Sequence, residues 1–135
     1  MKCNRWKYLV PSLFLAGCVG FVLPASAQDL SIKSGESIDL HSVYWIRNCK
    51  SLLKSFLGVD VLEGPPGITL SLREEPVQTS ARQNCQASVP GAMVVATAKQ
   101  GLTKNVETLK FRVRYETEEG QRQSSHSYKV YVYPQ

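Results

Sequence analysis

The C-terminal stretch from 108 to 134 constrains the fold of this chain more than any other segment. Apolar and charged residues alternate over 109–115, and the alternation returns over 128–132. A period of two buries one row of side chains and leaves the other in water. The segment between them, 117–121, carries Gly120 where a left-handed backbone would close a tight turn. The stretch therefore predicts a long β-hairpin.

The register of this hairpin also follows from the sequence. If Thr117 pairs with Gly120, then Phe111 lies opposite His126 and Leu109 lies opposite Tyr128. Both apolar rows then share one face, whereas a slip of one residue would put them on opposite faces, so burial selects this register. The other face carries a stripe of cations that ends in tyrosines, made up of Lys110, Arg112, Arg114, Lys129, Tyr131 and Tyr133.

Shorter alternating or apolar segments predict further strands at 29–33, 36–40, 59–61, 68–72 and 92–98. The segment 48–57 is spaced differently, because its apolar residues fall at i, i+3, i+4 and i+7: Cys49, Leu52, Leu53 and Phe56. This spacing predicts a short helix, with Asn48 and Gly58 as its caps. A strand is the alternative for 43–47, and the polar segment 74–90 is predicted to be the longest loop.

Six or seven short strands with one short helix are typical of a mainly β protein. The simplest arrangement for a chain of this length is an antiparallel β-sandwich of the immunoglobulin-like kind. A disulfide between Cys49, in the predicted helix, and Cys85, in the predicted loop, would differ from that of antibody domains. It would join two connections and not the centres of two sheets.

Residues 1–27 have the pattern of a signal peptide. Basic residues precede the apolar segment 8–23, and small residues at 24–27 suit cleavage before Gln28. One competing interpretation is a transmembrane helix, although proline and glycine interrupt the segment and it is short for a span. Another is lipidation at Cys18, because 15–18 resembles the motif at which bacterial lipoproteins are cleaved and anchored.

Without this leader, 108 residues remain (135 − 27), which is enough for one domain at 28–135. The leader also holds three of the 16 basic residues, so 13 remain against 11 acidic ones and the net charge falls from +5 to +2. This balance gives no indication of nucleic-acid binding. The mature chain is expected to have no transmembrane segment and to be periplasmic or extracellular, with the anchor at Cys18 as the minority alternative.

The two cysteines outside the leader are Cys49 and Cys85. In an oxidising compartment an isolated pair is predicted to form a disulfide. A redox-active or metal-binding pair is the alternative.

The run GPPGITLSLREEPV…QNC…VPGAMVVATAK…FRVRYET…GQRQSSHSYKVYVYP resembles small exported bacterial proteins of unassigned function. The likeness covers most of the chain after the leader. It implies no activity, cofactor or site residue.

Four features of the sequence are candidates for a site. His41 and His126 are the two histidines. A metal site would need both to converge with further donors, and a hydrolytic site would need one of them at a cleft; the alternative is that each fills a half-buried strand position. The acidic turn, Glu116 with Glu118 and Glu119, could bind calcium or be simply solvated. Trp45 beside Tyr44 could form an aromatic platform or belong to the core, and the basic stripe could contact an anion or keep a sheet face soluble.

These observations predict an exported, non-catalytic binding or structural module of the bacterial cell envelope that needs no cofactor. Its partner would be an anionic polymer or an acidic protein, met by the basic stripe. One alternative is a small periplasmic hydrolase or metal-binding protein that uses His126 or His41. Another is an inhibitor of a secreted enzyme, which would use the loop 74–90.

Overall fold

The computed structural model describes residues 28–80 and 82–135, and all of the regular structure in this part of the chain is β. The strands are β1 (Gln28–Lys33), β2 (Ser37–Val43), β3 (Ile46–Arg47), β4 (Lys50–Ser51), β5 (Leu53–Glu63), β6 (Ile68–Val77), β7 (Val89–Ala98), β8 (Asn105–Thr117) and β9 (Gly120–Tyr133). The prediction of a mainly β protein is therefore confirmed.

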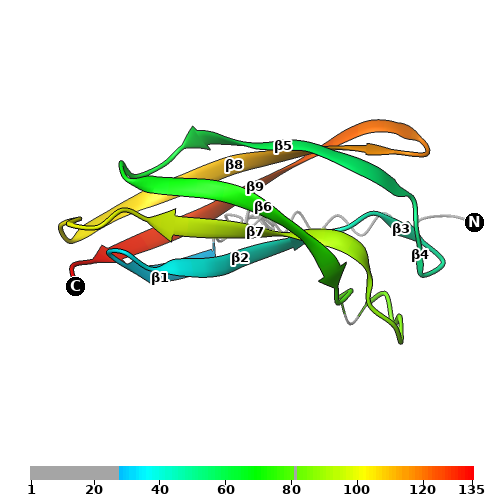
Figure 1. Ribbon diagram of the computed structural model, residues 1–135, viewed down its shortest axis with the longest axis horizontal. Coiled ribbons are helices and arrows are strands. Elements are labelled where there is room, and N and C mark those ends of the chain that lie inside the picture. The colour runs from blue at the N-terminus through cyan, green and yellow to red at the C-terminus, as the bar shows by residue number, and fades with distance from the viewer. Residues whose placement is uncertain (1–27, 81) are drawn as a thin grey trace, which may run out of the picture.

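The strands form two main sheets, of order β1-β9-β8-β5 and β2-β7-β6, with β3 and β4 as a separate small hairpin. All pairs are antiparallel except β1 with β9. The sheets face each other (Figure 1), and one apolar cluster lies between them. Its members come from both sheets and include Ile32, Val94, Ala96, Leu109, Phe111, Val113, Val130 and Val132.

The C-terminal hairpin is present in the predicted register. Thr117 pairs with Gly120, Phe111 with His126 and Leu109 with Tyr128, and the ladder continues without a shift to Asn105. Gly120 has a positive φ of 113°. The Thr117 hydroxyl donates to the carbonyl of Gly120 at 2.8 Å, which secures the turn. Alternation predicted this hairpin well because its two arms are adjacent in the sequence and each buries one face.

The predicted helix at 48–57 is wrong. Asn48 and Cys49 have positive φ values of 51° and 61° and form the turn between β3 and β4. The rest of the segment is part of β5, which pairs with β8. The predicted short strand at 59–61 is the end of this same long strand.

Irregular pairing in β5 explains the helix-like spacing. The ladder between β5 and β8 shifts between Leu53 and Ser55 and again between Phe56 and Gly58. Each extra residue resets the alternation, so Leu53, Phe56 and Val59 all pack against the core at intervals of three. A strand with two such shifts shows nearly the period of a helix.

The predicted loop at 74–90 is shorter than expected. β6 continues to Val77 and β7 begins at Val89, with Pro76 opposite Pro90 in the ladder. Pro76 is tolerated because β6 is an edge strand, and Pro90 lies outside the ladder that β2 forms on the other side of β7, which ends at Ala92. The predicted disulfide is confirmed: Cys49 in the β3–β4 turn is bonded to Cys85 in the β6–β7 loop. The leader and Cys18 lie outside the described residues.

Candidate functional site

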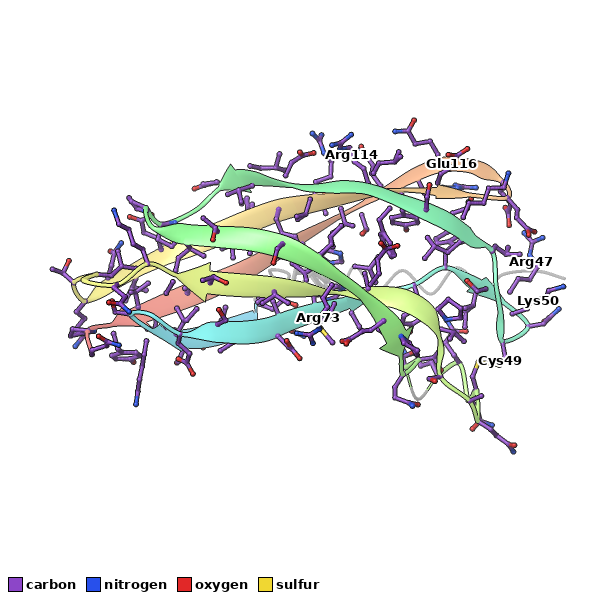
Figure 2. The ribbon with its side chains drawn as sticks, in the orientation of Figure 1. Arg47, Cys49, Lys50, Arg73, Arg114 and Glu116 are labelled. Atoms are coloured by element: carbon purple, nitrogen blue, oxygen red, sulfur yellow. A yellow bond between two sulfur atoms is a disulfide. The ribbon has the colours of Figure 1, made fainter. Side chains whose placement is uncertain are left out.

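The basic stripe lies on the outer face of β8, as predicted, but acidic residues of β5 lie beside it. Arg114 donates from Nε to Oδ2 of Asp60 at 2.8 Å, and Nη2 of Arg112 is 3.5 Å from the same oxygen. The hydrogen bond from Arg114 lowers the pKa of Asp60, so this carboxylate stays charged. Lys110 is 3.5 Å from Glu63. Figure 2 shows Arg114 and Glu116 on the outer side of this sheet.

The C-terminal part of the stripe is arranged differently. The ammonium of Lys129 lies 5.4 Å from the centre of the Tyr131 ring, within range of a cation–π contact. Tyr133 is 39% exposed at the end of β9. The six residues thus share one sheet. Three of the four cations, Lys110, Arg112 and Arg114, already contact a carboxylate, and the fourth, Lys129, contacts an aromatic ring.

The two histidines meet at a cavity on the other side of this sheet. The cavity has a volume of about 410 Å³ and opens between β2 and the N-terminal half of β9. We call it the histidine pocket, and its lining residues are His41, Ser42, Val43, Tyr44, Trp45, Gln78, Thr79, Ser80, Tyr115, Ser124 and His126. This lining contains two imidazoles but no Asp, Glu, Lys or Arg side chain.

The two imidazoles are in close contact, with their ring planes tilted by 40°. The ring centres of His41 and His126 are 3.9 Å apart. Nδ1 of His41 lies 2.9 Å from the hydroxyl oxygen of Tyr128. That hydroxyl donates its single proton to the carbonyl of Leu40 at 3.2 Å, so Nδ1 of His41 must be the donor of the other bond. The neutral His41 ring therefore keeps a lone pair on Nε2.

Both imidazoles are held in the neutral form. Burial lowers the pKa of His41. Burial, together with repulsion from His41, lowers the pKa of His126 to about 4. Burial also raises the pKa of Tyr128, which keeps its hydroxyl protonated. The histidine pair is thus a polar but uncharged wall of the pocket.

Aromatic rings make the rest of the wall. Trp45 is half-buried, 6.3 Å from Tyr115 between ring centres, and the guanidinium of Arg122 lies 5.2 Å from the Trp45 ring. The hydroxyl of Tyr44 accepts a hydrogen bond of 2.9 Å from the backbone N–H of Ser80. This bond and the disulfide both join the β3–β4 region to the β6–β7 loop, and Figure 2 shows Cys49 at this end of the molecule.

A serine hydroxyl lies beside one of the two imidazoles. Nε2 of His126 is 3.1 Å from the hydroxyl oxygen of Ser124. A base whose pKa is about 4 accepts a proton poorly at neutral pH, so it activates the hydroxyl weakly. Among residues 28–80 and 82–135, no group of three or more His, Cys, Asp or Glu side chains is placed to hold a metal ion.

The remaining candidates lie apart from the pocket. Glu119 forms ion pairs with Arg47 and, at 3.6 Å, with Arg122. These pairs give the acidic turn a structural role that needs no bound ion.

Sequence reasoning found some residues of the pocket and missed others. It singled out His41, His126 and Trp45 separately. It missed that they meet, and it missed Ser124 and Tyr115 altogether. The alternation of β9 does place Ser124 on the same face as His126, so this one neighbour was predictable.

Comparison with known proteins adds no relative. A scan against protein families, a search of curated proteins and a search of solved structures found no match. The part of the chain that the structure describes also contains no helix long and apolar enough to cross a membrane.

Proposed function

We propose that this protein is an exported, non-catalytic binding module of the cell envelope, and that the histidine pocket is its binding site. The observation that carries the proposal is the chemistry of the lining. Aromatic rings, neutral imidazoles and hydroxyl groups surround one open cavity of about 410 Å³. Ligand sites of proteins combine apolar walls with a few polar groups in this way.

The same chemistry indicates the kind of ligand. The described lining contains no carboxylate, lysine or arginine, and the cation beside its Trp45 ring, Arg122, is already 3.6 Å from Glu119. An apolar or aromatic group with neutral hydrogen-bonding atoms suits it. The hydroxyls of Ser42, Thr79, Ser80 and Ser124 can each donate or accept a hydrogen bond.

The basic stripe is a weaker candidate for the binding surface. A polyanion would have to compete with Asp60 for Arg112 and Arg114, and with Glu63 for Lys110. An anionic polymer or acidic protein would therefore bind this face less tightly than it would bind a row of cations without carboxylate partners.

Export and an immunoglobulin-like arrangement belong to the proposal as well. The signal-like leader supports export, and a disulfide is typical of an oxidising compartment. Two facing sheets of four and three strands support the immunoglobulin-like arrangement. Within this immunoglobulin-like arrangement, the first strand, β1, would pair in parallel with the last strand, β9.

The test is quantitative co-sedimentation of the purified exported protein with envelopes of its own bacterium. Trp45→Ala removes the largest ring of the pocket, and the pair Arg112→Ala with Arg114→Ala removes the centre of the basic stripe. We expect Trp45→Ala to weaken binding about tenfold, as loss of an aromatic anchor does, and the arginine pair to change it less than about twofold. The reverse result would move the site to the basic stripe, and no sedimentation of the wild type would contradict envelope binding altogether.

A further inference from the structure

β9 is paired along its whole length on one side but along only half on the other. β8 covers it from Gly120 to Val132. On the other side β1 covers only Tyr128 to Tyr133. In the part of the chain that the structure describes, nothing pairs with this side of β9 from Gly120 to Ser127. We call this segment the open edge.

The backbone groups that face the open edge can be identified. The carbonyl of Tyr133 points toward β1, because it accepts a hydrogen bond of 2.8 Å from the N–H of Ser34. Backbone groups point to alternate sides along an antiparallel strand, so residues an even number of positions from Tyr133 point the same way. The residues that present both N–H and C=O to the open edge are therefore Gln121, Gln123, Ser125 and Ser127.

The open edge lacks the protection that the edge strands β2, β5 and β6 have. The pairing of β5 is interrupted by three register shifts, and that of β2 by one between Asp39 and His41. β6 contains Pro76 and an ion pair between Arg73 and Glu75. Bulges, prolines and charges of this kind prevent strand addition. The open edge, by contrast, is regular and contains no proline, and its one Lys or Arg residue is Arg122 near the turn.

The histidine pocket lies directly beneath the open edge. Ser124 and His126 line the pocket from this segment of β9, while His41 and Ser42 line it from β2 on the facing sheet. Side chains of neighbouring strands point to the same face at paired positions. A strand added beside Ser124 and His126 would therefore direct every second side chain into the mouth of the pocket.

We propose that the open edge and the histidine pocket together bind an extended peptide segment of a partner protein, which adds to the sheet as a strand. An extended peptide is the occupant whose backbone matches a row of alternating donors and acceptors, and the β1–β9 ladder already shows this pairing on the same side of β9. Its anchor is an apolar or aromatic side chain in the pocket. This inference rests on the proposed function and specifies the class of ligand.

The experiment uses synthetic peptides as probes and the purified exported protein. The parent peptide has the length of the open edge, alternates Thr and Val, and has Phe at its centre. One variant has Ala in place of Phe, and another carries N-methyl groups on alternate backbone nitrogens, which removes donors without changing the side chains. Binding is measured by isothermal titration, and amide exchange of 121–127 reports where the peptide lies.

We expect each peptide variant to bind at least about tenfold more weakly than the parent, which is the loss of about 1.4 kcal/mol. We expect Ser125→Pro, which removes an outward N–H, to weaken binding of the parent peptide by a similar factor. Ser125→Ala keeps that N–H and is the matched control, with unchanged binding. The N-methylated peptide tests the same point if Ser125→Pro does not fold.

Several outcomes would overturn strand addition. Equal binding of the N-methylated and parent peptides would mean that the pocket holds a side chain without backbone pairing, and absence of peptide binding would reject this ligand class. If sedimentation velocity without peptide shows a dimer that Ser125→Pro dissociates, then the occupant is a second copy of the chain. Envelope binding that depends on Trp45 but ignores Ser125→Pro would leave the proposed function standing while this inference fails.

Discussion

The two adjacent histidines set the electrostatic character of the pocket. The ring centres of His41 and His126 are 3.9 Å apart, so a proton on either ring repels a proton on the other. The groups around them are the rings of Phe111 and Tyr128 and the hydroxyl of Ser124, none of which carries a charge at neutral pH. Each imidazole therefore loses hydration on folding without gaining a counter-charge.

This arrangement predicts a loss of stability in mild acid. The pKa of His126 is about 4 in the folded protein against 6.5 without the fold, so the unfolded chain binds more protons between these values. Stability is then fully present above about pH 6.5 and falls as the pH drops toward 4. Because the ring is only half-buried, we discount the shift and expect a loss of about 1–2 kcal/mol.

The measurement is urea unfolding at about pH 7 and about pH 4.5. His126→Gln removes the titrating group, and we expect it to show a smaller loss than the wild type between the two pH values. If both proteins lose the same free energy, then the neutral, desolvated imidazole pair is not the cause of the acid sensitivity.

Among the strands, β7 shows how closely the elements approach one another. It is the central strand of its sheet, and its inward side chains Ala92, Val94 and Ala96 are fully buried. At Gly91 a Cβ atom would lie 2.5 Å from the carbonyl oxygen of Val43. The end of β2 can pack here only because this position has no side chain.

We expect Gly91→Ala to destabilise the protein by about 2–3 kcal/mol, because backbone must move to relieve the overlap. Gly101→Ala is the comparison: its φ is +77° but no atom lies within 4 Å of the added Cβ. That change should cost only about 1 kcal/mol, from backbone conformation alone. Chemical denaturation of both variants measures the difference, and equal losses would show that close packing at Gly91 is unimportant.

In the whole molecule, the Cys49–Cys85 disulfide joins two connections at the same end as the histidine pocket. It links residues 36 positions apart. The side chain of Tyr44, in the connection just before β3, also bonds to the backbone of Ser80 in the β6–β7 loop. The bridge therefore ties the hairpin that follows the pocket residues Tyr44 and Trp45 to the loop that contains Ser80.

Removing the bridge should lower the unfolding free energy by about 3–4 kcal/mol, chiefly because the unfolded chain gains freedom. The test compares the Cys49→Ser, Cys85→Ser double variant with the wild type under reducing and oxidising conditions. Reduced wild type should match the double variant. A variant as stable as the oxidised wild type would mean that the β3–β4 turn and the β6–β7 loop are held by other contacts.

The sequence by itself determined the hairpin of β8 and β9, its register and the pairing of Cys49 with Cys85. Alternation specifies register when two arms are adjacent and each buries one face. With Cys3 and Cys18 assigned to the leader, the other two of the four cysteines allow one pairing. The basic stripe was likewise predictable as a face. Its neutralisation was not, because Asp60 and Glu63 come from a strand that alternation did not reveal.

Only the tertiary structure decided between helix and strand at 48–57. The bulges of β5 give Leu53, Phe56 and Val59 a spacing of three, and what selects a strand is the exposed edge of β8, which is distant in sequence. The meeting of His41 with His126 has the same origin. Their strands belong to different sheets, and a period of two says which face a side chain takes but not which residue of the facing sheet it will touch.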